Sequence, residues 1–280
     1  MAVLSALRTA GRTVVRNPVI LAVTAAFGLF QLPQLFARVV SPVVAGLVSL
    51  LVSGLLIFVV PFFQGGIIGM ANEGVSGSTG VGTFLEQGKD NYVSLLVVYL
   101  LVMAVGFVFG IVVFVGALFG GGLALAGGSE AGMASLGAVA VFLLLAGLVY
   151  LLVAFFTQFY GHAIVIDDLG AIAGIKHSVR TVRAHLLSTT GYSLVVGLVS
   201  ALFGVAGAAV SIFTARSGQF AAASATSSAT PTAVPTLQPT MAVVLGLVVF
   251  LLAGAVGGFA AAYSVAFYRE IREPTPGLGA

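Results

Sequence analysis

Long stretches without a charged residue are the feature that most restricts the fold of this chain. No Asp, Glu, Lys or Arg occurs between Asp90 and Glu130, between Glu130 and Asp167, between Arg183 and Arg216, or between Arg216 and Arg269. Apolar stretches of about 18 residues or more are typical of membrane-spanning helices. Only 7% of the 280 residues are charged, whereas a soluble domain carries roughly 25%. We therefore predict an all-α polytopic protein of the cell membrane.

The apolar sequence divides into six predicted transmembrane helices. They cover about Pro18 to Phe36, Pro42 to Phe63 (with the helix continuing toward Asn72), Tyr92 to Leu118, Leu136 to Gln158, Leu187 to Thr214 and Met241 to Phe267. The transmembrane domain then spans 18–270, after an amphipathic cytoplasmic segment over 1–17 and before a cytoplasmic tail over 271–280. Two of the outer connections are described by their composition: a Gly- and Ala-rich one from Gly120 to Ala134, and a flexible extracellular one over 217–240, rich in Ser, Thr and Pro.

The basic residues predict the orientation of these helices. Nine of the 11 Lys and Arg residues fall on one side of the predicted topology and only Arg38 and Arg216 on the other. Because cytoplasmic connections carry the excess of Lys and Arg, both termini should be cytoplasmic. The nine are Arg8, Arg12, Arg16, Lys89, Lys176, Arg180, Arg183, Arg269 and Arg272.

Three short segments have the pattern of helices that lie at the membrane surface. In the first, residues 1–16, Leu4, Leu7, Gly11 and Val14 form a small-to-apolar stripe. A signal peptide is the alternative for this segment, but no small-residue cleavage site follows it cleanly. The other two are cytoplasmic, over about 81–92 and 171–185; in the latter, an apolar stripe is formed by Ile172, Ile175, Val179, Val182 and Leu186.

The two cytoplasmic connections resemble each other, which indicates an internal repeat. Gln64 precedes Glu73 by the same interval as Gln158 precedes Asp167, and an amphipathic segment follows each acid. Two copies in the same orientation would be related by an axis along the membrane normal.

Two groups of polar residues are candidate sites. Lys176, Arg180 and Arg183 recur on one face of the segment 171–185, where they would bind anionic lipid headgroups; the alternative is that they only anchor the topology. The second group would line a polar vestibule at the inner ends of two spans, and structural hydrogen bonding or interfacial solvation is its alternative. Its members are Gln64, Glu73, Gln158, His162, Asp167 and Asp168.

Other chemistry finds little support in the sequence. The chain has no Cys, and the spacing of His162 from Asp167 or Asp168 does not suit a metal on one helix face. We expect no metal, no cofactor, no nucleic-acid partner and no enzymatic activity, because hydrolase, metalloprotease and nucleotide-binding motifs are lacking. Three glycine pairs have the spacing of close helix packing: Gly106 with Gly110, Gly116 with Gly120, and Gly254 with Gly258.

Two stretches carry a resemblance to known families. Pro61–Met70 (PFFQGGIIGM) with Phe84–Tyr92, and Gln158–Gly170 (QFYGHAIVIDDLG) with Ile175–Arg180, are similar to multipass membrane proteins of halophilic archaea whose family has no assigned activity. The second stretch distantly resembles the membrane domain associated with glycerophosphodiester phosphodiesterases. This resemblance implies a helical membrane module linked to phospholipid metabolism, without phosphodiesterase activity, because the catalytic barrel is absent.

Three functions remain open on the sequence. The first is a non-enzymatic module that engages anionic membrane lipids or a membrane protein partner. The second is a small-solute or lipid transporter built from the repeat, although the midplane residues are almost wholly apolar. The third is a subunit of a larger complex.

Overall fold

The computed structural model describes residues 2–28, 42–126, 128–201 and 239–272, and within these ranges the chain is helical and has no strand. The helices are α1 (Ala2–Arg16), α2 (Val19–Gly28), α4 (Pro42–Ser76), α5 (Val81–Asp90), α6 (Tyr92–Ala126), α7 (Gly128–Thr157), α8 (Tyr160–Ile166), α9 (Ala171–Ala184), the helix Leu186–Ala201, and α11 (Pro239–Ile271). The predicted all-α class is confirmed.

Several of these helices have the length and composition of membrane spans. Three stretches are long and apolar enough to cross a membrane: Gly46–Ser76, Tyr92–Gly122 and Gly132–Ile166. A fourth span results if α9 and the helix Leu186–Ala201, which meet at 103°, count together. In the most apolar part of each of the three stretches, at most 6% of the residues are buried. Apolar side chains therefore form the outer surface of these helices.

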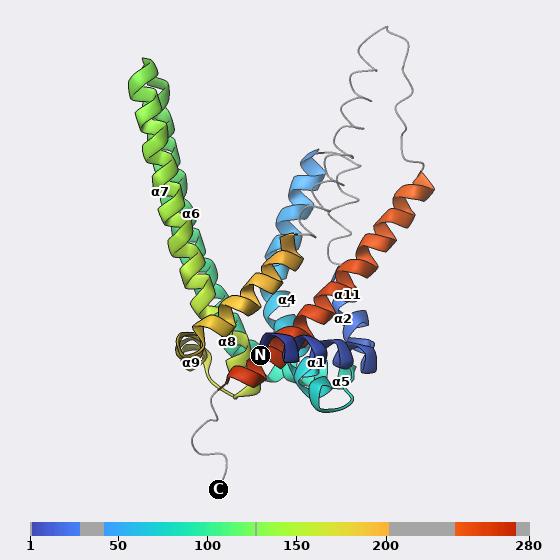
Figure 1. The fold of residues 1–280 in the computed structure, drawn as a ribbon. Helices are drawn as coiled ribbons and strands as arrows, with labels where there is room; N and C mark the ends of the chain where they lie inside the picture. Colours follow the sequence, from blue (N-terminus) through green and yellow to red (C-terminus); the bar gives the residue numbers. More distant parts are fainter. Residues whose placement is uncertain (1, 29–41, 127, 202–238, 273–280) are drawn as a thin grey trace.

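The buried core lies at one end of the long helices, in what we call the basal layer: α1, α5, α8, α9 and the C-terminal end of α11 (Figure 1). The largest fully buried side chains include Phe159, which directly precedes α8, and Tyr263, Phe267 and Tyr268 of α11. The Tyr192 ring stacks on Phe267 with 4.6 Å between centroids. Aromatic packing thus joins α11 to α8 and to the helix Leu186–Ala201.

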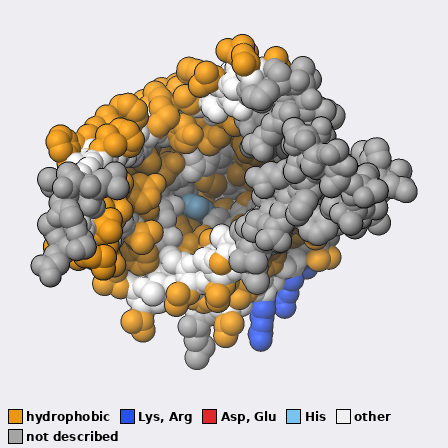
Figure 2. Space-filling model, turned by 90° about the horizontal axis from the view of Figure 1, so that it is seen from above, with side chains coloured by type: hydrophobic (Ala, Val, Ile, Leu, Met, Phe, Trp, Pro, Cys, Tyr) orange, Lys and Arg blue, Asp and Glu red, His pale blue; other side chains and the backbone are white. Residues whose placement is uncertain are grey.

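Above the basal layer the long helices separate. The antiparallel pair α6 and α7 rises on one side, and α4, the helix Leu186–Ala201 and α11 rise on the other (Figure 1). Seen from above, the molecule is hollowed between them, and the described side chains around this hollow are mainly hydrophobic (Figure 2).

The predicted glycine packing is confirmed for two of the three pairs. A Cβ built on Gly120 would lie 1.9 Å from Val139 Cγ2, and one on Gly116 would lie 2.4 Å from the Phe142 ring, so these glycines allow α6 to approach α7. In α11, a Cβ on Gly254 would lie 2.5 Å from Ala25 Cβ and one on Gly258 would lie 2.7 Å from Leu21 Cδ2, both in α2. Gly106 and Gly110 have no atom within 4 Å of such a Cβ, so the prediction is wrong for that pair.

The short helices begin and end close to their predicted bounds, but their buried faces differ from the predicted stripes. In α1 the buried residues are Ala6, Ala10 and Thr13, whereas Leu4 is 67% exposed. In α9 the buried face is formed by Gly174, His177, Ser178, Thr181 and Val182. Small residues face the protein in both helices because they let two helix backbones approach closely.

One predicted connection is itself helical. The segment from Gly120 to Ala134 belongs to α6 and α7 apart from residue 127, which lies outside the described residues. Its Gly- and Ala-rich sequence contains no proline, and alanine favours helix. Also outside the described residues are 29–36 of the first predicted span, Arg38, Arg216, nearly all of the connection 217–240, and 273–280 of the tail.

Candidate functional site

Helix α9 is held against the junction of α7 and α8 by a serine that was not predicted from the sequence. Between Thr157 and Tyr160 the chain breaks from α7 into α8, which leaves backbone groups without helical partners. The Ser178 hydroxyl donates to the Phe156 carbonyl at 2.9 Å and accepts from the Phe159 N–H at 3.1 Å. Gly174, where a Cβ would lie 3.3 Å from the Tyr160 carbonyl, completes the close approach.

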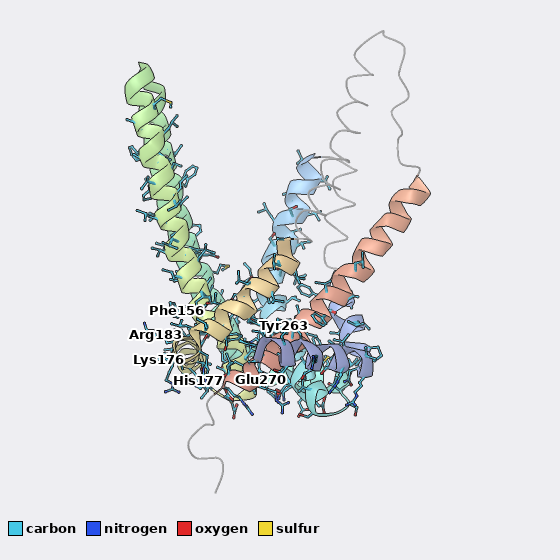
Figure 3. All side chains as sticks on the ribbon, viewed as in Figure 1. Phe156, Lys176, His177, Arg183, Tyr263 and Glu270 are labelled. Carbon is cyan, nitrogen blue, oxygen red and sulfur yellow. The ribbon has the colours of Figure 1, made fainter. Side chains whose placement is uncertain are left out.

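This packing turns the three cations of α9 outward. Lys176, Arg180 and Arg183 are all exposed, and Figure 3 shows Lys176 and Arg183 at the outer edge of the basal layer. Arg180 Nη2 lies 3.1 Å from His177 Nδ1, and the Arg183 guanidinium lies 5.7 Å from the centroid of the Phe156 ring. Among the described residues, the ion pairs involve only Asp167, so no carboxylate neutralises these three charges.

A groove opens beside this helix, between α7 and the helix Leu186–Ala201. Its volume is about 510 Å³. Its walls are apolar and its polar lining consists of Gln158 and Ser193. The Ser193 hydroxyl donates to Gln158 Oε1 at 3.2 Å, and Gln158 Nε2 donates to the Phe155 carbonyl at 2.9 Å. The apolar lining is formed by Leu148, Leu151, Leu152, Ala154 and Phe155.

Asp167 is the centre of a buried polar cluster at the other side of α9. Its side chain is 4% exposed. Arg272 Nη1 donates to Oδ1 at 2.9 Å, the Tyr268 hydroxyl donates to Oδ2, and His177 Nε2 lies 3.7 Å from Oδ2. The carboxylate therefore connects the turn after α8 to α9 and to the end of α11.

The other residues predicted for a vestibule lie in separate places. Tyr160 donates to Gln64 Oε1 at 3.2 Å, and the buried His162 lies 3.0 Å from Ser264 Oγ through its Nε2. Glu73 is exposed and accepts from the Thr83 hydroxyl. Asp168 is exposed and has a φ of 51°, which Asp tolerates better than most residues.

No hydrogen bond joins any two of the six predicted vestibule residues in the part of the chain that the structure describes. Gln64 Nε2 lies against Gly161, the neighbour of His162 in the sequence. Within the same described ranges, no three His, Asp or Glu side chains are grouped as metal ligands.

Sequence reasoning missed Ser178, Ser193, Tyr268 and Arg272. Arg272 entered the sequence analysis only as part of the charge bias, because its partner Asp167 is 105 residues away. Ser178 bonds the backbone where α7 ends, and Ser193 lines the groove. Neither role has a local sequence signature.

Comparison with protein families matches residues 1–271 to the family described as Domain of unknown function (DUF7847). The chain belongs to this family. No curated protein and no solved structure matches the chain. The DUF7847 region includes every helix named above, so the basal layer, the groove and the cations of α9 all lie within the family's domain.

Proposed function

We propose that this DUF7847 protein is an integral membrane module that binds anionic lipid through Lys176, Arg180 and Arg183. The observation that carries the proposal is three exposed cations that have no carboxylate partner among the described residues, on a helix that meets an apolar helix at 103°. That angle suits a helix lying along the membrane surface beside a helix that enters the membrane. Each basic residue near an anionic surface contributes about 1 kcal/mol.

We propose in addition that the chain crosses the cell membrane six times, with both termini in the cytoplasm. The support is the distribution of charge: every Lys and Arg in the described ranges lies in α1, α5 or α9, or at the C-terminal end of α11, all of which belong to the basal layer. An excess of Lys and Arg marks the cytoplasmic side. The six proposed spans correspond to α2, α4, α6, α7, the helix Leu186–Ala201 and α11.

The internal repeat is part of the same proposal. Helices α5 and α9 each follow a turn of equal length, 77–80 and 167–170. Each begins after a glycine with extended backbone, Gly80 with ψ of 174° and Gly170 with ψ of 165°. After a single residue, Asn91 or His185, a long apolar helix follows each of them. These matched geometries support two copies of one unit.

The resemblance to archaeal membrane proteins and to the membrane domain linked to glycerophosphodiester phosphodiesterases agrees with a role at phospholipids and stays a prediction. A transporter is the alternative activity, favoured by the hollow between the two groups of helices (Figure 2). We rank it second because the groove next to Gln158 has leucine and phenylalanine walls rather than a polar path.

The proposal is tested by thermal unfolding of the purified protein in detergent with added lipid. Ligand binding to the folded state alone at 100 times its Kd stabilises that state by about 2.7 kcal/mol. A short-chain phosphatidylglycerol should therefore raise the melting temperature, and the zwitterionic phosphatidylcholine of equal chain length should not. Equal effects of the two lipids would contradict the proposal.

A further inference from the structure

The groove beside α9 and the cations of α9 lie close enough to hold two parts of one molecule. Phe155 lines the groove, and its ring centroid lies 5.5 Å from that of Phe156. The Arg183 guanidinium lies over the other ring of this pair, 5.7 Å from the Phe156 centroid. The wall of the groove is therefore continuous with the site of a positive charge.

The groove is apolar along most of its length and polar at the end near the basal layer. Leu151 lies about 1.7 turns and Leu148 about 2.5 turns of α7 before its end at Thr157, and Gln158 directly follows that end. Gln158 and Ser193 thus lie at the basal end of an otherwise apolar groove. An occupant would meet apolar side chains along the groove, then amide and hydroxyl groups, and then cations. This sequence matches the acyl chain, the backbone and the headgroup of an anionic lipid.

We infer that this groove is the binding site of a single anionic phospholipid from the surrounding leaflet. One acyl chain lies along Leu148, Leu151 and Phe155, and the phosphate contacts Arg183 and Lys176. The charge complementarity between phosphate and these cations selects the occupant. The inference rests on the proposed function and adds the position of the bound lipid and the contact that holds its chain.

The groove and the cations contribute differently to this binding site. Contact of the acyl chain with the groove is apolar and does not distinguish one phospholipid from another. The cations attract the phosphate and select anionic over zwitterionic headgroups. A probe placed in the groove should therefore detect the preference for anionic over zwitterionic lipid, although the groove itself carries no charge.

The absence of Trp from the chain makes a direct test available. Leu151→Trp places a single fluorophore in the groove, in the full-length protein reconstituted into bilayers. Val108→Trp is the matched control: Val108 is 60% exposed and Leu151 is 64% exposed. The two residues lie at one level, because Phe109 contacts Tyr150 with 5.4 Å between centroids. Val108 does not line the groove.

The measurement is quenching of each Trp by phosphatidylglycerol or phosphatidylcholine brominated on the acyl chain, at equal mole fraction. We expect quenching in Leu151→Trp to be at least twofold stronger with the brominated anionic lipid. The two lipids should quench equally in Val108→Trp. Adding Lys176→Ala and Arg183→Ala to Leu151→Trp should abolish the preference.

Equal quenching by the two lipids in Leu151→Trp would overturn the inference. If anionic lipid nevertheless raised the melting temperature of the protein, the proposed function would stand with its lipid outside this groove. If anionic lipid gave neither stronger quenching in Leu151→Trp nor a higher melting temperature, both the inference and the proposed function would be contradicted. A preference that survived the double Ala substitution would also overturn the inference, because the cations would not select the occupant.

Discussion

The Arg272 guanidinium donates a hydrogen bond of 2.9 Å to the Asp167 carboxylate, and this contact joins the end of α11 to the turn between α8 and α9. Tyr268 donates to the other oxygen of the same carboxylate. Because α1 packs on α11 and the cations lie on α9, Asp167 connects the two sides of the basal layer. The cluster is therefore expected to fix the position of α9 rather than to bind a ligand.

Asp167→Asn should lower the thermal stability of the protein in detergent. The substitution removes the charge that Arg272 and Tyr268 bind, and hydrogen bonds to charged groups contribute about 1.5–3 kcal/mol. Asp168→Asn is the matched control: it is exposed and asparagine also tolerates its positive φ, so its melting temperature should stay close to that of the wild type. Additive effects of Asp167→Asn and Arg272→Gln would contradict a direct contact, since coupled residues are not additive.

Asn17→Ala should also destabilise the protein. Asn17 is 3% exposed; its Nδ2 donates to the Gly77 carbonyl at 3.1 Å, and its Oδ1 accepts from the Thr79 N–H at 2.9 Å. Removing it breaks two part-buried hydrogen bonds to the backbone of the α4–α5 turn, and a typical hydrogen bond contributes about 0.5–1.5 kcal/mol. Ser78→Ala, at an exposed position of the same turn, is the control. A melting temperature unchanged by Asn17→Ala would show that these hydrogen bonds from Asn17 do not stabilise the turn.

Gly254→Val should be poorly tolerated and Gly106→Val well tolerated. A Cβ on Gly254 would lie 2.5 Å from Ala25 Cβ, so valine forces α11 away from α2. It would also weaken the bond from the Thr24 hydroxyl to the Gly254 carbonyl, which is 2.7 Å long. A Cβ on Gly106 would have no atom within 4 Å. The two variants are compared by their yield of monodisperse protein and by their melting temperature. Equal losses in Gly254→Val and Gly106→Val would show that α2 and α11 do not pack as described.

Gln158→Cys should react slowly with a membrane-impermeant thiol reagent from either side of sealed proteoliposomes. In our account lipid, not water, fills the groove that Gln158 lines. The native chain has no Cys, so the introduced thiol is the sole target. Lys89→Cys, on the exposed face of α5, should react quickly from the cytoplasmic side only. Fast reaction of Gln158→Cys from the outer side would favour the transporter.

The bounds of α5 and α9 were predictable from sequence, but their buried faces were not. A membrane protein exposes apolar residues to lipid, so an apolar stripe does not distinguish a lipid-facing surface from a core. Ile172 belongs to the predicted stripe of α9 and is 68% exposed, whereas Gly174 and Ser178 are buried. The candidate cations were predictable because their spacing is local. The partners of Asp167 were not, because Arg272 and Tyr268 approach it only through the packing of α11.

The most direct test of the central claim is native mass spectrometry of the protein extracted gently from its membrane. We would compare Lys176/Arg180/Arg183→Ala with Arg8/Arg12/Arg16→Ala, which removes the same charge from exposed positions of α1. At about 1 kcal/mol for each cation, the α9 variant should bind anionic lipid about 100-fold more weakly. The account predicts that the wild type and the α1 variant retain anionic lipid and that the α9 variant loses it. Equal retention in all three proteins, or equal loss in both variants, would contradict a lipid site on α9.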